Sequence, residues 1–423
     1  MKKTSKLGRS RRDFLKSAAA TAAFAAVGGL ARTARGQSNE PIKIGQPTIL
    51  SGRVARLGES SRDGAQMAID AFNAAGGLNG RKLQLVTRDS KGRPDEAARV
   101  VRELINTDKC QIILDSEASS AAFAVQEVIR QTGTLCMHAC SETTSLTANP
   151  KIRAANAFRC ARQDIHDSIA GGRYAAQFVK QQGFKRWMIC SPDYAYGRDV
   201  SALFFHFLKE SEPSVEVVSE TWPKLFAPDY TENITKILQT KPQALYSALY
   251  GGDLVTFIDQ GNLYGLFDQL TLFDPNMADY TTLEAVKKLP KGIHSGDRYL
   301  STFPNTKANA DWAAEYQKKF NVPPINWSWQ NYVGMTFIIE AMKKTGSVDS
   351  KALSDAIRGM TIDSPFGVDG KITMRAEDQT IINYAIGWGV IIPNAPYLED
   401  IKPADWNVIL ELEKDWKKKK GYI

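Results

Sequence analysis

Histidine is scarce in this sequence, with four residues of this type in a chain of 423. None of them (His138, His166, His206 and His294) is paired with another at the spacing of metal ligands, so we do not expect a histidine-based zinc site. The chain also lacks the G-x-S-x-G elbow of serine hydrolases and the G-x-x-x-x-G-K-[ST] loop that holds phosphates. These absences argue against an enzyme, and we expect no catalytic residue, no metal and no cofactor.

Cysteine is also uncommon. The five residues are Cys110, Cys136, Cys140, Cys160 and Cys190. An odd number leaves at least one thiol unpaired within the chain, and the spacing gives no disulfide framework. We expect most of these thiols to be buried, because free cysteine behaves as a small apolar residue. One bridge remains open as an alternative.

Cys140 lies near His138 and Glu142 in the sequence, an arrangement that could suggest a thiol nucleophile with a base. Neighbours two positions apart on a strand or loop do not easily converge on one reacting atom, and no separate orienting group is evident. We therefore do not assign a catalytic role to this cysteine.

Long apolar runs are missing. Residues 17–31 carry no charge, but this stretch is too short and too rich in alanine to span a bilayer of roughly 30 Å. It follows Arg11 and Arg12 in a segment that resembles the bacterial twin-arginine signal, and small residues precede Gln37 at the spacing of a cleavage site. We expect residues 1–36 to be an export signal and the mature protein to be periplasmic. The alternative is a basic tail followed by a buried alanine-rich helix.

Excess charge is confined to this segment. Residues 1–36 hold nine of the 54 Lys and Arg residues but only one of the 46 acidic residues. The remaining chain is therefore neutral, although the whole sequence has a formal charge of +8. A neutral mature chain does not support nucleic-acid binding.

The rest of the sequence alternates short β-rich runs with amphipathic helical stretches. This order is typical of α/β folds with parallel sheets and helices on both faces. One series of strands and helices runs from residue 42 to about 140, and a second begins with a helix over residues 164–182. Two sheets in tandem would bind a ligand at the carboxyl ends of their strands, in one shared cleft.

Several motifs resemble the leucine/isoleucine/valine-binding family of periplasmic receptors of ABC transporters. The most distinctive is the run from Asn73 to Leu83, N-A-A-G-G-L-N-G-R-K-L. The run P-T-I-L-S-G from Pro47, the pair Phe158-Arg159 before Asp164, and the run D-Y-A-Y-G from Asp193 follow in the family's order. The resemblance covers residues 42–389.

This resemblance implies a type I periplasmic binding protein, with two Rossmann-like lobes joined by a hinge of three crossings. Residues 37–163 plus 299–383 would form lobe 1, and residues 164–298 plus 384–423 would form lobe 2. A ligand would be held between the lobes as they close.

The resemblance also implies ligand contacts. In the family, a serine and backbone N–H groups at a helix start bind the ligand carboxylate, which places Ser119 and Ser120 there. A helix N-terminus suits an anion, although either serine could simply cap the helix. The second contact falls at Cys140 and at Glu142 or Thr143. Because Glu142 would repel a carboxylate, either Thr143 takes this role or the ligand differs.

Two acids of the family bind a ligand ammonium. Asp164 occupies the first of these positions, but Asn276 occupies the second, so one counter-charge is missing. Asp253, where the family often has an aromatic residue, could compensate. Tyr196 matches an aromatic residue of the cleft, and Trp327 lies either in the side-chain pocket or in the core.

The expected function is therefore capture of an amino acid or a related small carboxylate or amide, for delivery to an ABC permease in the inner membrane. Two alternatives from other classes remain: a ligand sensor that reports to a regulator, and an exported Rossmann-type oxidoreductase.

Overall fold

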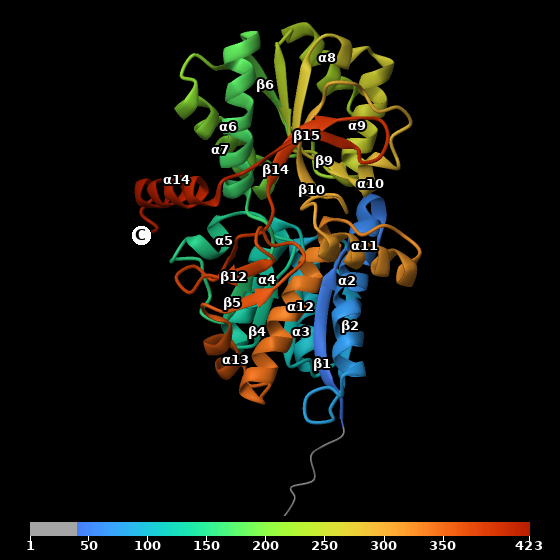
Figure 1. The fold of residues 1–423 in the computed structure, drawn as a ribbon, viewed down its shortest axis with the longest axis vertical. Helices are drawn as coiled ribbons and strands as arrows, with labels where there is room; N and C mark the ends of the chain where they lie inside the picture. Colours follow the sequence, from blue (N-terminus) through green and yellow to red (C-terminus); the bar gives the residue numbers. More distant parts are fainter. Residues whose placement is uncertain (1–39) are drawn as a thin grey trace, which may run out of the picture. The chain divides into compact units, whose positions relative to one another are not determined.

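The computed structural model describes residues 40–423, so the expected signal segment lies outside the described residues. Residues 41–423 form one compact unit, drawn in Figure 1. The strands are β1 (Ile42–Thr48), β2 (Leu83–Asp89), β3 (Ile112–Asp115), β4 (Leu135–His138), β5 (Ala157–Arg159), β6 (Arg186–Cys190), β7 (Glu216–Thr221), β8 (Ala244–Ser247), β9 (Thr271–Asp279), β10 (His294–Tyr299), β11 (Thr361–Asp363), β12 (Lys371–Met374), β13 (Ile381–Ile382), β14 (Gly387–Ile391) and β15 (Leu398–Pro403). The helices are η2 (Gly52–Val54), α2 (Ala55–Ala74), α3 (Pro94–Asn106), α4 (Ser119–Thr132), α5 (Ser145–Ala148), α6 (Asp164–Gln182), α7 (Ala195–Ser211), α8 (Thr231–Thr240), α9 (Gly251–Leu263), η3 (Leu266–Asp268), α10 (Tyr280–Leu283), α11 (Lys307–Phe320), α12 (Asn326–Thr345), α13 (Ser350–Ile357) and α14 (Trp406–Lys419).

The first sheet has five parallel strands in the order β2-β1-β3-β4-β5. Alternate side chains of a strand point to opposite faces, and β3 shows this clearly. Ile112 and Leu114 pack in the core with α2 and α12, whereas Ile113 between them packs with α3 and α4. Both faces of the sheet are therefore covered by helices, as a buried parallel sheet requires.

The second sheet has seven strands in the order β15-β14-β10-β9-β8-β6-β7. Strands β6 to β10 are parallel, and β14 and β15 are antiparallel additions at one edge. The same alternation holds in β6, where Trp187 packs with α6 and α7 and Met188 packs with α8 and α9. Two mostly parallel sheets confirm the α/β class predicted from the sequence.

The chain passes from the first sheet to the second after β5, returns after β10 and passes again between β13 and β14. The small antiparallel sheet β11-β12-β13 lies beside β5, since Arg159 bridges to Thr380 and its N–H donates to the carbonyl of Gln379. The carboxyl ends of the parallel strands in both sheets face the region where the two sheets meet (Figure 1).

The glycine-rich segment after α2 forms a tight turn. Gly77 has a φ of +72°, and a Cβ at this position would lie 2.1 Å from the carbonyl oxygen of Arg81. Leu78 and Arg81 form a bridge that closes the turn before β2. This segment is a helix-to-strand connection and not a phosphate loop.

All five cysteines are buried free thiols, so the alternative of an intrachain bridge is not realised. None of the helices described in residues 40–423 combines the length and the apolar character needed to cross a membrane.

Candidate functional site

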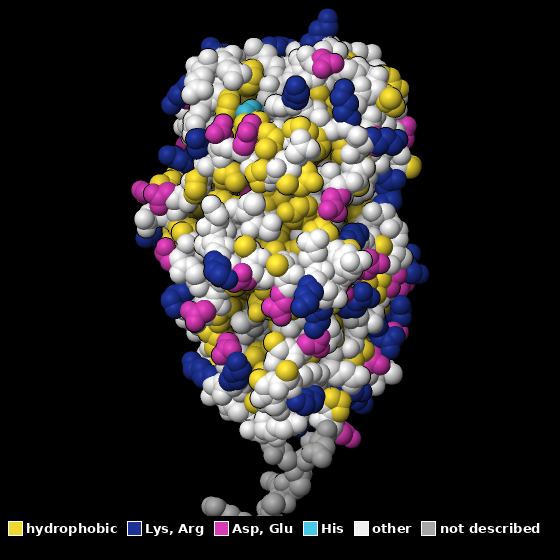
Figure 2. All heavy atoms as spheres, turned by 45° about the vertical axis from the view of Figure 1, so that its right-hand side comes forward, with side chains coloured by type: hydrophobic (Ala, Val, Ile, Leu, Met, Phe, Trp, Pro, Cys, Tyr) yellow, Lys and Arg dark blue, Asp and Glu magenta, His cyan; other side chains and the backbone are white. Residues whose placement is uncertain are grey.

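A pocket of about 480 Å³, partly open to solvent, lies where the two sheets meet. Hydrophobic side chains gather on the surface in a band across the middle of the face shown in Figure 2. The lining residues are Leu57, Ala118, Ser119, Cys140, Glu142, Tyr194, Tyr196, Tyr250, Gly251, Asn276, Asp279, Thr281, Arg298, Asn326 and Trp327.

Most lining residues occupy strand ends or helix starts. Ser119 begins α4 directly after β3, Tyr196 lies in the first turn of α7 after β6, and Trp327 lies in the first turn of α12. Asn276 and Arg298 are near the carboxyl ends of β9 and β10. Parallel sheets bind ligands at this edge because successive strand-to-helix turns converge there.

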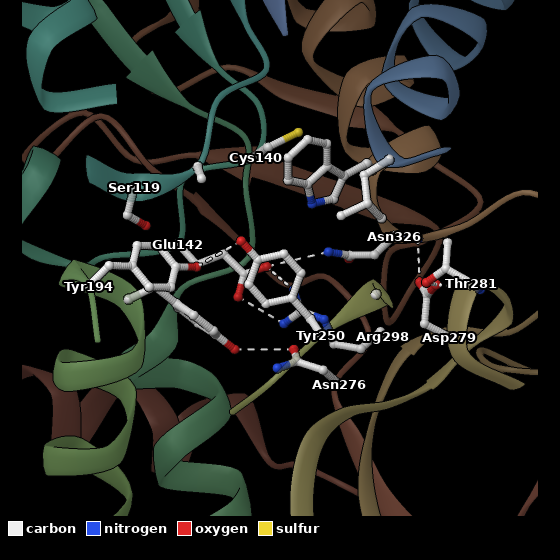
Figure 3. A pocket seen from close by; sticks show the side chains of 15 residues that line it. Ser119, Cys140, Glu142, Tyr194, Tyr250, Asn276, Asp279, Thr281, Arg298 and Asn326 are labelled. Atoms are coloured by element: carbon white, nitrogen blue, oxygen red, sulfur yellow. Dashed lines mark hydrogen bonds and ion pairs between the residues drawn. The ribbon is translucent and has the colours of Figure 1, made fainter. Parts of the chain in front are cut away.

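Three tyrosines, Tyr194, Tyr196 and Tyr250, form one wall of the pocket, and Figure 3 labels Tyr194 and Tyr250. The ring centroids of Tyr194 and Tyr196 are 6.0 Å apart, and each lies 6.4 Å from that of Tyr250. Tyr194 Oη donates to Tyr250 Oη at 3.3 Å, and Tyr196 Oη donates to Asn276 Oδ1 at 3.1 Å. Burial, followed by the nearby Glu142 carboxylate, raises the pKa of Tyr196 well above its usual range. These hydroxyls therefore stay protonated and act as hydrogen-bond donors.

A buried ion pair joins the two sheets inside the pocket. Arg298 Nη1 lies 2.8 Å from Glu142 Oε2, and Arg298 Nη2 donates to Glu142 Oε1, so the pair is bidentate. Their side chains are 8% and 5% exposed. Burial alone would lower the pKa of Arg298, but Glu142 and its other acidic neighbours raise it well above its usual range. The guanidinium is therefore permanently charged.

The ion pair continues behind the pocket. Arg298 Nη1 is 3.3 Å from Asp167 Oδ2, and Arg162 Nε donates to the same oxygen at 3.2 Å. Asn326 Nδ2 donates to Glu142 Oε1 at 3.3 Å from the start of α12. The Glu142 carboxylate is therefore fixed by a guanidinium and an amide (Figure 3).

Asp279 carries the second carboxylate of the pocket, at the end of β9. Its Oδ1 accepts from Thr281 N at 3.0 Å and caps α10, and its Oδ2 accepts from Asn326 N at 3.0 Å at the start of α12. Two helix starts thus stabilise this negative charge.

Five of the nine residues predicted as ligand contacts line this pocket, namely Ser119, Cys140, Tyr196, Asn276 and Trp327. The Sγ of Cys140 accepts from Asn331 Nδ2 at 3.3 Å, and burial raises the pKa of its thiol well above the usual range. This cysteine is therefore a neutral part of the wall.

The other four predicted contacts lie outside the lining. Ser120 Oγ accepts from the Ala195 N–H at 3.5 Å, and Thr143 N donates to Ser119 Oγ at 3.4 Å. Of the two alternatives after β4, Glu142 lines the pocket and Thr143 does not.

The two acids that were predicted to meet a ligand ammonium both have protein partners in this structure. Asp164 Oδ1 accepts from Thr144 N at 2.9 Å, and its side chain borders a different cavity beneath α14. Burial raises the pKa of Asp164 well above its usual range, with a further contribution from Asp199. Asp253 Oδ2 accepts from Phe226 N at 2.7 Å, and Asp253 Oδ1 pairs with Arg53.

The sequence did not identify Arg298, Asp279, Asn326, Tyr194 and Tyr250 as pocket residues. All lie at the end of a strand or at the start of a helix, and that position is the signal that could have found them. Tyr194 also lies two residues before Tyr196 in the same motif.

The pocket offers hydrogen-bond donors, two carboxylates, one guanidinium and aromatic walls. Within residues 40–423, no group of three or more His, Cys, Asp or Glu residues is arranged to hold a metal ion. The described side chains are therefore suited to hold a small polar molecule with an apolar part.

Comparison with known proteins gives consistent matches. A family model described as periplasmic binding protein matches residues 41–386. A leucine-, isoleucine-, valine-, threonine- and alanine-binding protein from Pseudomonas aeruginosa is 24% identical over 387 residues, which cover 90% of this chain and 97% of that protein. A Leu/Ile/Val-binding protein from Rhizobium johnstonii is 25% identical over 326 residues, covering 75% and 83% of the two chains.

Solved structures share the fold. A solute-binding protein of an ABC transporter from Rhodopseudomonas palustris, in complex with 3,4-dihydroxybenzoic acid, has a TM-score of 0.76 at 24% identity, covering 85% of this chain and 95% of that chain. The isoleucine-bound branched-chain amino acid binding protein LivJ from Streptococcus pneumoniae has a TM-score of 0.73 at 20% identity, covering 86% and 99%.

Proposed function

Because this chain belongs to the periplasmic binding protein family, we propose that it is the solute-binding component of an ABC importer. It captures an amino acid or a related small carboxylate or amide in the pocket between the two sheets. The similar proteins named above bind amino acids in one group and a hydroxylated benzoic acid in another.

The observation that supports this proposal best is the start of α4 in the pocket wall. Ala118 and Ser119 line the pocket, and α4 runs for 14 residues behind them. The first N–H groups of a helix have no partner within the helix and carry a partial positive charge. This end therefore suits a ligand carboxylate, while the tyrosines and Trp327 enclose its apolar part.

We propose that the two sheets belong to lobes that close on the ligand. Residues 37–163 plus 299–383 form lobe 1, and residues 164–298 plus 384–423 form lobe 2. The assignment of β1–β5 to one sheet and of β6–β10, β14 and β15 to the other supports these bounds. The three connections between the sheets would serve as the hinge.

Export to the periplasm through a twin-arginine signal and docking on an ABC permease in the inner membrane complete the proposal. The run S-R-R-D-F-L-K from Ser10 supports the signal. Replacing Arg11 and Arg12 with Lys should retain the protein in the cytoplasm, and unchanged export of this variant would contradict the twin-arginine route.

Ligand capture is tested by native mass spectrometry of co-purified small molecules, followed by isothermal titration of ligand-free protein. Amino acids, aromatic acids, short amides and urea should be titrated, and we expect one class to bind in a one-to-one complex. Silence across all four classes would refute the proposed function.

A further inference from the structure

The pair formed by Glu142 and Arg298 gives the pocket a charge balance that bears on its selectivity. Glu142 follows β4 of the first sheet, and Arg298 lies on β10 of the second sheet. Both residues line the pocket, so both groups of the pair are within the space that a ligand would enter.

The two arginines at this pair, Arg298 and Arg162, are each already bound to a carboxylate. Arg298 contacts Glu142 and Asp167, and Arg162 pairs with Asp167, so two carboxylates face two guanidinium groups. All four side chains are buried, with 8% exposure or less. Asp279 adds one more carboxylate to the pocket wall. Among the described residues that line the pocket, the cationic side chain is Arg298, and it is paired with Glu142. A ligand that carries only a negative charge therefore meets no unpaired cation there.

We propose that the Glu142–Arg298 pair determines the charge class of the ligand, selecting a zwitterion such as an amino acid and rejecting a monocarboxylate of the same shape. This inference rests on the proposed function of the pocket. It assigns a role in ligand selection to Glu142, the carboxylate after β4 that departs from the pattern of the family.

A monocarboxylate has two unfavourable ways to bind. If it takes Arg298 from Glu142, it leaves a buried carboxylate without its partner, which is strongly destabilising. If it binds the start of α4 instead, it brings a further negative charge into a pocket whose lining already includes the Glu142 and Asp279 carboxylates and one guanidinium. Figure 3 shows the Glu142 carboxylate directed toward Arg298 and Asn326 within the pocket.

A zwitterion avoids both costs. Its carboxylate binds the start of α4, and its ammonium lies near a carboxylate of the pocket without breaking the ion pair. Charge-assisted hydrogen bonds of this kind are stronger than neutral ones. The ammonium thus balances the negative charge of the ligand carboxylate. A monocarboxylate lacks this group and brings an unbalanced negative charge into the pocket with Glu142.

The test uses ligand pairs that differ only in the ammonium group. The probes are L-leucine with 4-methylpentanoate, and L-phenylalanine with 3-phenylpropanoate, titrated into ligand-free protein. We expect the unmodified protein to bind one of the amino acids at least about tenfold more tightly than its partner acid.

The variant Glu142→Gln keeps the shape and an acceptor for Arg298 but removes the charge. We expect it to lose affinity for the amino acid and to gain affinity for the partner acid, so that the ratio falls by about tenfold or more. Glu127→Gln is the matched control, since Glu127 lies on α4 with a side chain that is 55% exposed and pairs only with Arg130 in a salt bridge. The ratio should not change in the control.

A second variant distinguishes a change in charge balance from misfolding or a general loss of binding. Adding Arg298→Gln to Glu142→Gln removes one charge of each sign, so the gain in affinity for the partner acid should disappear. Equal binding of both members of a pair by the unmodified protein, or an unchanged ratio in Glu142→Gln, would overturn this inference while the proposed function stands. No binding of any probe or of any broader class would refute both.

Discussion

Arg53 and Asp253 connect the two sides of the pocket, with Arg53 Nε 3.4 Å from Asp253 Oδ1. Arg53 lies in η2 after the first strand, and Asp253 lies in the first turn of α9. Arg53 Nη2 also donates to the carbonyl of Gly252 at 3.0 Å and to Thr256 Oγ1. Asp253, which the sequence suggests as a possible ligand contact, pairs here with Arg53 across the two sides of the pocket.

Arg53→Ala should weaken ligand binding without changing the pocket wall. Arg53 is about one-third exposed, so we expect a loss of about 1 kcal/mol, or roughly fivefold in Kd, mainly through faster dissociation. Stopped-flow fluorescence measures that rate, and small-angle scattering should show a more open ligand-free form. Arg62→Ala, which removes an exposed arginine of α2, is the control. An unchanged dissociation rate in Arg53→Ala would contradict this role.

The family resemblance implies a ligand contact at the positions of both Asp164 and Asn276, but only Asn276 lines the pocket. Asp164 contacts Thr144 and does not line the pocket, whereas Asn276 lines it and contacts Tyr196. We expect Asp164→Asn to leave ligand affinity within about twofold, because the amide still accepts from Thr144. Asn276→Ala should weaken binding by about tenfold, because it leaves the buried Tyr196 hydroxyl without its acceptor. Isothermal titration of both variants measures the two losses of affinity. A larger loss in Asp164→Asn than in Asn276→Ala would support the ammonium contact at Asp164.

The sequence was sufficient for the fold because its patterns are local. The helix predicted over residues 164–182 is α6, and the turn at Gly77 lies where its positive φ is needed. The site was only partly predictable, because side chains such as Arg298 and Glu142 are 156 positions apart and meet only when the two sheets face each other. Spacing along the chain carries no signal for such a pair.

Glu117 should make stability depend on pH. Its carboxyl group is fully buried, and burial, followed by the nearby Asp115 carboxylate, raises its pKa from 4.5 to about 8. The folded state therefore holds a proton that the unfolded chain releases above pH 4.5, so stability falls as pH rises through the window from 4.5 to 8. This one group accounts for up to about 4 kcal/mol across that window.

The check is denaturant unfolding at pH 5 and pH 9 for the unmodified protein and for Glu117→Gln. The variant cannot ionise, so the loss of unfolding free energy between the two pH values should be smaller than in the unmodified protein. An equal loss in both proteins would show that Glu117 is not the titrating group.

Glu413 anchors the C-terminal helix α14 to the rest of the chain. Its carboxylate accepts from Arg375 Nη1 at 2.6 Å, lies 2.7 Å from Lys417 Nζ and lies 3.3 Å from His166 Nε2. The side chain is 1% exposed, and its contacts with His166 and Arg375 hold its pKa well below the usual range despite burial. Glu413→Gln should cost about 3 kcal/mol, because it leaves buried cations undercompensated. Urea unfolding measures the loss, the exposed Glu411→Gln is the control, and equal stability of the two variants would contradict the anchoring role.

Trp327 tests whether the apolar wall of the pocket contributes to ligand affinity. Its side chain lies in the first turn of α12, is 6% exposed and lines the pocket together with Leu57 and Cys140. The sequence leaves open whether this residue belongs to the pocket or to the core. In the structure it lines the pocket and also packs in the core. Removing the indole should therefore reduce both affinity and stability.

Trp327→Ala should weaken binding of a ligand with a large apolar side chain by about tenfold or more, because the indole buries a large apolar area against it. A small ligand such as glycine or urea should lose less. Stability should fall by about 3 kcal/mol from the cavity that remains. Trp222→Ala is the control, because the ring of Trp222 lies outside the pocket, 3.7 Å from the guanidinium carbon of Arg198. If titration shows the same loss for large and small ligands, the effect comes from the fold, and Trp327 does not select the ligand side chain.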